Sequence, residues 1–430
     1  MKRESWTRYR SERMPRITSP KHLLIVATKL GYQTRVMADV ARRLGAHVSL
    51  ATDRCHLLDD PWGDQAIPVR FDALPESVLE AVKDRTFDAI IAVDDRPAYL
   101  AALIAERAGV PFHPARAACA ATNKFETREC FRRAALPVPA YTRWAVDADP
   151  AEVASAVRYP CVLKPLGLSA SRGVIRANDV KELVAAFLRI RRLLQSPQLA
   201  RLRDPAMAYI QVEDFLPGRE FALEGLVTGG RLQVLALFDK PDPLNGPYFQ
   251  ETIYVTPSRE PEPVQRRIFA AAQRAVTALG LTQGPVHAEM RVDDERVWML
   301  EVAPRPIGGL CAKTLVFAGD VSLEEVIVRH ALGEDMSGVR LRNGAAGVMM
   351  IPVPRAGVYQ GACGVEAAQA MADEVILTAK EGQTMQPLPE GNTYLGFLFA
   401  WDESAVAVET RLRNAHAALE FHIAELLPVV

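Results

Sequence analysis

The first third of the chain alternates short apolar runs with segments in which apolar residues recur at helical spacing. A short apolar run bounded by polar or turn residues is typical of a buried strand, and the recurring pattern is typical of an amphipathic helix. Strands that alternate with helices of this length predict βαβ units and a parallel sheet. The expected strands are His22–Thr28, Val48–Thr52 and Asp88–Val93, and the expected helices are Thr34–Leu44 and Ala98–Ala108.

The middle third changes to pairs of strands around helices, which predicts an α+β module after a boundary near residues 111–123. Hairpins are expected to turn at Gly229-Gly230 and at residues 294–296. The strands are expected at Pro160–Pro165, Tyr209–Val212, Glu220–Leu226, Leu232–Phe238, Val286–Val292 and Val297–Val302. The helices are expected at Lys124–Ala135 after Thr122-Asn123, at Val180–Leu194 capped by Asn178, and at Val264–Leu279 before Gly280.

From about residue 345 the chain becomes apolar with frequent glycine. This region predicts strands at Ala346–Pro352, Val375–Thr378 and Tyr394–Trp401, followed by a helix over Glu403–Phe421. Its apolar surface could supply the face of a homodimer.

The composition changes this picture little, because it is that of an ordinary globular chain: 430 residues, 49% apolar and 24% charged. The 51 basic and 52 acidic residues nearly cancel, so no global field favours nucleic acid or an anionic membrane. No apolar run is long enough to span a membrane, and the first 21 residues lack the apolar core of a secretory signal. The six cysteines show no CxxC pair and no zinc spacing. We therefore expect a cytoplasmic multidomain enzyme that binds neither nucleic acid nor membrane.

The first strand excludes one common function of a parallel sheet. It runs into residues 27–32, Ala-Thr-Lys-Leu-Gly-Tyr, so the GxGxxG fingerprint of dinucleotide binding is absent. Open α/β sheets nevertheless bind ligands at the carboxyl ends of their strands. Asp94 and Asp95 follow the third strand directly, and either could meet a substrate ammonium or cap the next helix.

A strand that ends at Lys164 is followed by small or flexible residues and then by a second strand. Small residues such as Ser169, Ser171 and Gly173 let backbone N–H groups approach an anion, and the lysine adds a point charge. The segment therefore predicts a flap over a phosphate, while a solvent-exposed hairpin explains this segment alone equally well. A Walker loop is excluded, because GxxxxGK[ST] is missing and a strand follows the loop in place of a helix.

The segment from Gln211 to Glu220 contains acidic and apolar residues around a Pro-Gly turn. Glu213 and nearby backbone amides could meet the edge of an adenine, and Phe215 could line a slot for the ring. Glu220 could then reach a ribose hydroxyl. An edge strand with exposed acidic residues is the alternative, and it suffices for this segment taken alone.

The second hairpin carries the strongest combination of residues. His287, Glu289 and Arg291 share one face of a strand by the period of two. A three-residue turn at 294–296 would place Glu289 opposite Glu301. Two facing carboxylates repel unless a cation lies between them, and a site of few oxygen ligands suits Mg²⁺ that also binds phosphates. An exposed hairpin with ordinary charges is the alternative.

Arg305 follows the hairpin on a turn, and Gly308-Gly309 come next, where small residues permit close approach of a ligand. Two acids and an arginine around a phosphate are what phosphoryl transfer requires. Lys124 lies in the first turn of a helix, where a cation opposes the helix dipole unless a polyphosphate is near. Lys240 could contact phosphate or be an ordinary surface lysine.

Together these motifs resemble the ATP-grasp ligases over about residues 20–310. The resemblance implies that ATP is held by Lys124, Lys164 and the loop containing Ser169, Ser171 and Gly173, with Glu213 and Phe215 at the adenine, Glu220 at the ribose and Lys240 at phosphate. It implies Mg²⁺, or Mn²⁺ in its place, on Glu289 and Glu301, with Arg305 beside them. The family motif E-x-N-P-R has Ala303 in place of its asparagine here, so a second metal ion would lack one ligand.

Within that superfamily the chain is most similar to the L-amino-acid ligases. The similarity is carried by residues 239–258, by His287-Ala288-Glu289 and by the segment from Gly391-Asn392 to Ala400. It implies an α/β and α+β multidomain ATP-grasp fold. The parts expected are a flexible basic tail (1–20), a Rossmann-like domain (21–118), an ATP-grasp domain (119–336, lid about 145–210) and a C-terminal domain (337–430).

The resemblance also implies a reaction with amino-acid substrates. ATP would phosphorylate one carboxylate, and a second amine would attack the acyl-phosphate to give an amide, ADP and phosphate. Arg305 with Gly308 and Gly309 would hold the reacting carboxylate, His287 would lie near the acceptor amine, and Lys164 would assist at the phosphate. The alternatives are a γ-glutamyl-type ligase, a purine-pathway carboxylating enzyme and a nucleotide-binding regulator without catalysis.

Overall fold

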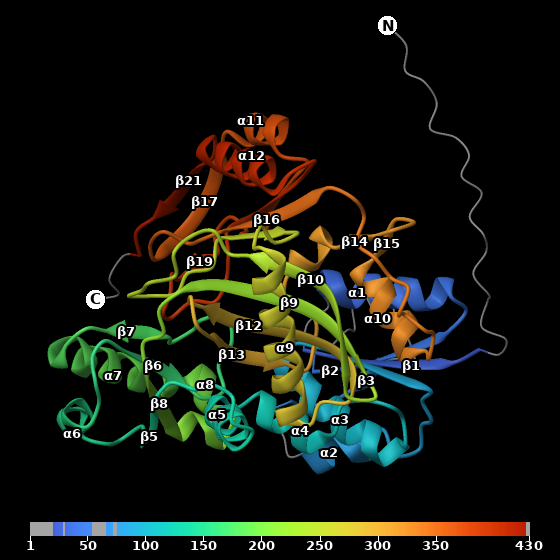
Figure 1. Cartoon of the computed structure of the whole chain (residues 1–430), viewed down its shortest axis with the longest axis horizontal. Helices are drawn as coiled ribbons and strands as arrows, with labels where there is room; N and C mark the ends of the chain where they lie inside the picture. The colour runs from blue at the N-terminus through green and yellow to red at the C-terminus, as the bar shows by residue number, and fades with distance from the viewer. Residues whose placement is uncertain (1–19, 29–30, 54–65, 72–74, 427–430) are drawn as a thin grey trace, which may run out of the picture.

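The N-terminal part of the computed structural model is a four-stranded parallel sheet in the order β3-β2-β1-β4 (Figure 1). The structure describes residues 20–28, 31–53, 66–71 and 75–426, so residues 1–19 of the predicted tail lie outside it. The elements are β1 (His22–Ala27), α1 (Tyr32–Arg43), β2 (His47–Thr52), β3 (Ala66–Pro68), α2 (Pro75–Ala81), β4 (Ala89–Val93) and α3 (Asp95–Ala108).

The strand β1 is apolar along its whole length because both of its faces are covered. Leu23 and Ile25 belong to the core cluster that includes residues of α1, whereas Leu24 and Val26 belong to the cluster that includes residues of α2 and α3. This is the burial expected for a parallel sheet with helices on both sides, and the predicted parallel sheet is confirmed.

A second four-stranded sheet, ordered β5-β8-β6-β7, forms the lid region (green in Figure 1). The elements here are α4 (Ala115–Ala121), α5 (Lys124–Arg133), β5 (Tyr141–Ala145), α6 (Pro150–Ser155), β6 (Cys161–Pro165), β7 (Ile175–Ala177), α7 (Val180–Leu194), α8 (Pro197–Ala200), η2 (Pro205–Ala208) and β8 (Tyr209–Asp214). One cap differs from the prediction: Asp179 accepts the hydrogen bond from the Glu182 N–H, and Asn178 instead donates to the Glu182 carboxylate. The helix α4, within the predicted boundary, had no distinct pattern because its residues are mostly alanine.

The largest sheet has eight strands in the order β13-β12-β9-β10-β11-β16-β20-β18. Its last three strands come from the C-terminal part of the chain, so that part continues the central sheet. The elements from the central part are β9 (Arg219–Thr228), β10 (Arg231–Asp239), β11 (Ile253–Thr256), α9 (Glu262–Leu279), β12 (Gln283–Val292), β13 (Val297–Ala303), η3 (Cys311–Thr314), β14 (Val316–Phe317), β15 (Val321–Ser322) and α10 (Leu323–Ala331). The helix α9 packs on one face of this sheet, and residues of α10 and of β1 contribute to the core on the other.

The hairpin of β12 and β13 pairs Glu289 with Glu301, as predicted, but by a different route. The turn has four residues, 293–296, because Val292 already pairs with Val297. A β-bulge beside Glu289 then shifts the register by one residue. The predicted three-residue turn is therefore wrong, while the predicted facing pair is confirmed.

The C-terminal end differs most from the sequence prediction. Its elements are β16 (Ala345–Ile351), β17 (Gly357–Cys363), α11 (Val365–Met371), β18 (Glu374–Leu377), β19 (Thr384–Met385), β20 (Gly396–Asp402), α12 (Ala405–Ala417) and β21 (Glu420–Ala424). The predicted helix over Glu403–Phe421 is too long, because residues after Ala417 turn and pair with β17 as β21. Pairing with a distant strand overrides the local helical pattern there. No helix in the described part of the chain is long and apolar enough to cross a membrane.

Candidate functional site

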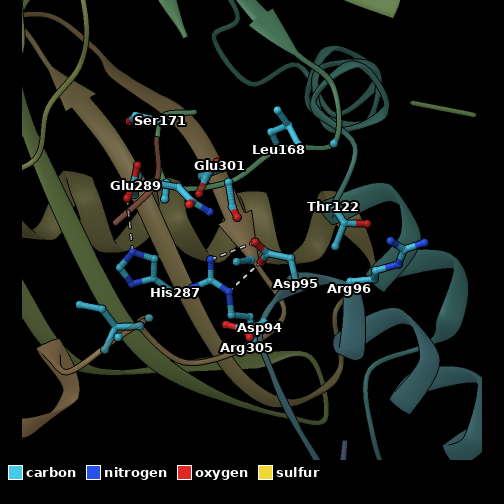
Figure 2. Close-up of a pocket in the computed structure, with 18 of the residues that line it drawn as sticks. Asp94, Asp95, Arg96, Thr122, Leu168, Ser171, His287, Glu289, Glu301 and Arg305 are labelled. Carbon is cyan, nitrogen blue, oxygen red and sulfur yellow. Dashed lines mark hydrogen bonds and ion pairs between the residues drawn. The ribbon is translucent and has the colours of Figure 1, made fainter. Parts of the chain in front are cut away.

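A cavity of ≈2010 Å³ lies where the parts of the chain meet. It is lined by the segment after β4, by the lid sheet, by the β12–β13 hairpin and by residues of the C-terminal region (Figure 2). The structure brings to it all the predicted site residues except Gly173 and Lys240: Asp95, Lys124, Lys164, Ser169, Ser171, Glu213, Phe215, Glu220, His287, Glu289, Glu301, Arg305, Gly308 and Gly309.

Two lysines reach the cavity from the lid side. Asn123 caps α5 through the N–H groups of Phe125 and Glu126, which fixes Lys124 at the start of the helix. The Lys124 ammonium donates to the carbonyl of Leu168 at 2.5 Å, next to the flap. Lys164 ends the apolar strand β6, and burial lowers its pKa from the ordinary value. A cation in each of two elements on one side of a cavity suits a polyphosphate.

Glu213, predicted to face an adenine, is committed to internal cations. Its carboxylate receives Lys164 Nζ at 2.8 Å and Arg128 Nε at 3.0 Å, and only 2% of the side chain is exposed. Burial alone would raise the pKa of Glu213, but the charges of Arg128 and Lys164 outweigh it and lower the pKa to about 2. Phe215 and nearby backbone therefore remain on this side of the cavity for a ring. Sequence reasoning missed Arg128, which lies on a helix far from β8 in sequence.

Lys240 lies behind the cavity wall within a cluster of carboxylates. Its ammonium is 3.0 Å from Glu220, 2.6 Å from Glu251 and 3.3 Å from Glu289. These three carboxylates are close enough together to hold a metal ion. Lys240 already contacts all of them, and although burial opposes its charge, they raise its pKa well above the ordinary value. The surface or phosphate-contacting lysine predicted here is instead an internal counter-ion.

Glu289 and Glu301 differ from that cluster in having oxygens left over. The contacts of Glu289 with Lys240, His287 and Tyr254 all use Oε1. Within the described residues, no hydrogen-bond donor or cation contacts the Glu301 carboxylate. Burial, and next the charge of Glu289, raise the pKa of Glu301. Facing carboxylate oxygens without a protein cation between them are a donor set that fits Mg²⁺.

His287 is held from the opposite side by a carboxylate that sequence reasoning missed. Glu224 on β9 lies opposite His287 on β12, and its Oε1 is 2.5 Å from His287 Nδ1. Burial would lower the pKa of His287, but the bonds to Glu224 and Glu289 raise it to about 9. The ring is thereby fixed with Nε2 toward Glu289, as the dashed contact in Figure 2 shows.

Arg305 and Asp95 form a paired contact across the cavity (Figure 2). Arg305 Nε and Nη2 donate to the two carboxylate oxygens at 2.7 and 3.2 Å. Burial would raise the pKa of Asp95, but the charge of Arg305 outweighs it and keeps the pKa below the ordinary value. Asp94 occupies the N-cap position of α3, yet its side chain makes no capping bond there. The structure thus assigns Asp95 to holding Arg305, and not to capping.

The flap after Lys164 contacts the C-terminal region. Ser169 and Ser171 line the cavity, whereas the Gly173 N–H donates to the Pro389 carbonyl at 2.8 Å. A Cβ on Gly173 would lie 2.6 Å from the Pro165 ring, and its φ is +74°, so glycine is required there. Gly308 has open space around it, which leaves room next to Arg305.

Comparison with known proteins agrees with this geometry. Residues 157–314 match the family model of the ATP-grasp domain, and residues 349–424 match that of the L-amino acid ligase C-terminal domain 2. The alanine–anticapsin ligase of Bacillus amyloliquefaciens is 27% identical over 252 residues, 54% of this chain and 52% of the relative. The D-alanine–D-alanine ligase of Verminephrobacter eiseniae is 26% identical over 223 residues, 49% of this chain and 62% of the relative.

The chain spans 42% to 61% of the length of the curated relatives that it matches first. Among solved structures, the L-amino acid ligase of Bacillus licheniformis has the same fold, with a TM-score of 0.76 and 24% identity over 95% of this chain and 100% of that chain. The chain therefore belongs to the ATP-grasp superfamily and carries, after its ATP-grasp domain, the C-terminal domain of the L-amino acid ligases.

Proposed function

We propose that this protein is an ATP-dependent ligase that joins two amino acids, or an amino acid and an amine, through an acyl-phosphate. One observation carries the proposal. Two lysines on the lid side of the cavity and Arg305 beyond it flank a pair of facing carboxylates, Glu289 and Glu301, that retain unpaired oxygens. Polyphosphate, metal and carboxylate sites in this order are what transfer of a phosphoryl group to a carboxylate requires.

The roles proposed for the residues follow from their contacts. Lys124 and Lys164 would bind the phosphates of ATP, and Ser169 and Ser171 would cover them. Mg²⁺ bound by Glu289 and Glu301 would neutralise charge on the phosphoryl group. Ala303 also lines the cavity, opposite His287, and offers no oxygen for a second ion.

The carboxylate of the first amino acid would displace ADP from the γ-phosphate, and the amine of the second would then displace phosphate. Arg305, oriented by Asp95, would stabilise the charge on the reacting carboxylate oxygens. His287, oriented by Glu224, would lie near the incoming amine. The flap would exclude water that would otherwise hydrolyse the acyl-phosphate.

Phosphate release tests this proposal. The purified protein would be incubated with Mg²⁺ and ATP, with each amino acid alone and in pairs, and the products would be weighed by mass spectrometry. We expect phosphate release that depends on a pair of amino acids and an adduct lighter than the pair by one water. No adduct with any pair, under conditions in which ATP binds, would contradict the proposal.

A further inference from the structure

An apolar subsite lies in the cavity next to Arg305. We define it by five residues, all of which line the cavity: Leu310, Cys311, Met350, Tyr394 and Phe397. Three of them belong to one hydrophobic cluster, and the other two pack against it. The chain thus brings a turn after β13, the strand β16 and the segment entering β20 together around one wall of the cavity.

The subsite adjoins the position proposed for the reacting carboxylate. A Cβ on Gly309 would lie 3.6 Å from the ring of Phe397, so this ring faces the Gly308-Gly309 backbone. The rings of Tyr394 and Phe397 are 5.8 Å apart in an edge-to-face arrangement. A side chain on the α-carbon of an amino acid whose carboxylate lies at Arg305 would therefore extend toward these rings.

The charged group nearest to the subsite is already neutralised. Glu251 Oε1 accepts Lys240 Nζ at 2.6 Å and the Tyr254 hydroxyl at 2.8 Å. A charged substrate side chain would lose its hydration against aromatic and aliphatic groups without a free partner of opposite charge. An apolar side chain would instead gain by leaving water.

We infer that the amino acid whose carboxylate is activated carries an uncharged, apolar side chain of the size of leucine or methionine. This inference rests on the proposed function, because it assumes that Arg305 holds the reacting carboxylate. It goes beyond it by naming the class of the first substrate.

Binding and product analysis test the inference together. Calorimetry with Mg²⁺ and a nonhydrolysable ATP analogue would compare leucine with aspartate, and methionine with lysine, which are pairs of similar size. We expect leucine and methionine to bind about 10- to 100-fold more tightly, the range for burying such a side chain. In any dipeptide formed, they should occupy the N-terminal position, which comes from the activated carboxylate.

A matched pair of variants separates the subsite from the surrounding core. Phe397→Leu enlarges the subsite, and we expect it to shift preference from leucine toward phenylalanine by about tenfold. Phe399→Leu is the control, because Phe399 stacks on Phe397 at 6.5 Å in the same strand but is fully buried and does not line the cavity. It should leave the ranking of amino acids unchanged.

The outcomes distinguish this inference from the proposed function. Tight binding of leucine and methionine without any dipeptide would support the subsite and contradict the ligase. Dipeptides that begin with aspartate or lysine would support the ligase and overturn the subsite. An equal shift of preference in both phenylalanine variants would also overturn it.

Discussion

Replacing Arg128 by methionine is expected to destabilise the ATP-grasp domain, because this side chain is the main counter-charge of a buried carboxylate. Arg128 is 1% exposed, and its Nε lies 3.0 Å from Glu213, which is 2% exposed. Its Nη1 also donates to the carbonyl of Leu300 at 2.8 Å. Methionine is similar in length but leaves Glu213 with Lys164 as its one remaining cation within the described residues.

Two magnitudes can be worked out for this change, and they agree. Removing one partner of a buried ion pair usually lowers the free energy of unfolding by about 3–5 kcal/mol. The fall in the pKa of Glu213 from 4.5 to about 2 corresponds to about 3 kcal/mol in favour of the charged form. Because Lys164 remains in place, we expect the lower end of the range, about 3 kcal/mol.

The assay is urea unfolding of the protein without ligands, followed by circular dichroism. Arg132→Met in the same helix is the matched control: Arg132 is 57% exposed in its pair with Glu129, so we expect a loss below about 1 kcal/mol. The folded pKa of Glu213 lies below its ordinary value, so its stabilisation is present above about pH 4.5 and is lost as the pH falls toward 2. The deficit of the Arg128 variant should therefore shrink between these values. Equal losses in the two variants, or a deficit that is the same at low pH, would refute this reasoning.

Three further substitutions test the site. Lys164→Met should weaken binding of a nonhydrolysable ATP analogue about tenfold or more by calorimetry, whereas Lys181→Met, on the exposed side of α7, should not; an unchanged affinity would remove the phosphate role. Glu289→Gln should lower Mg²⁺-dependent phosphate release by about 100-fold or more with an unchanged circular dichroism spectrum, and normal turnover would exclude it as a metal ligand. Glu390→Gln removes the paired contact of Arg189 that joins the lid to the C-terminal region, so we expect more phosphate release per dipeptide formed; an unchanged ratio would show that this contact does not keep the flap closed.

Local signals explain how much of the fold the sequence predicts. The strands of the N-terminal sheet are continuous apolar runs, and Asn123 and Gly280 mark helix ends by chemistry that acts within a few residues. The segment 403–421 fails for the same reason, because its end forms β21 only through pairing with β17. The facing pair of Glu289 and Glu301 was reached through two errors that compensate, a turn one residue longer than predicted and a bulge.

The candidate site shows a sharper division between what local pattern predicts and what it does not. Side chains that face the cavity follow strand ends or alternate along a strand, so pattern alone could find them. Their internal partners could not be found, because the choice of partner depends on which strands are neighbours. Glu224 contacts His287 only because β9 lies beside β12, and Arg128 reaches Glu213 from a helix 85 residues earlier in the chain.

These internal partners decide which charges remain for a ligand. Counted from the sequence, the hairpin and its surroundings offer several equivalent carboxylates, and any two of them could hold a cation. In the structure, Lys240 contacts three carboxylates, and Arg128 with Lys164 neutralises Glu213. The oxygens left facing the cavity belong to Glu301 and to Oε2 of Glu289, which is the reason to place the metal between these two residues.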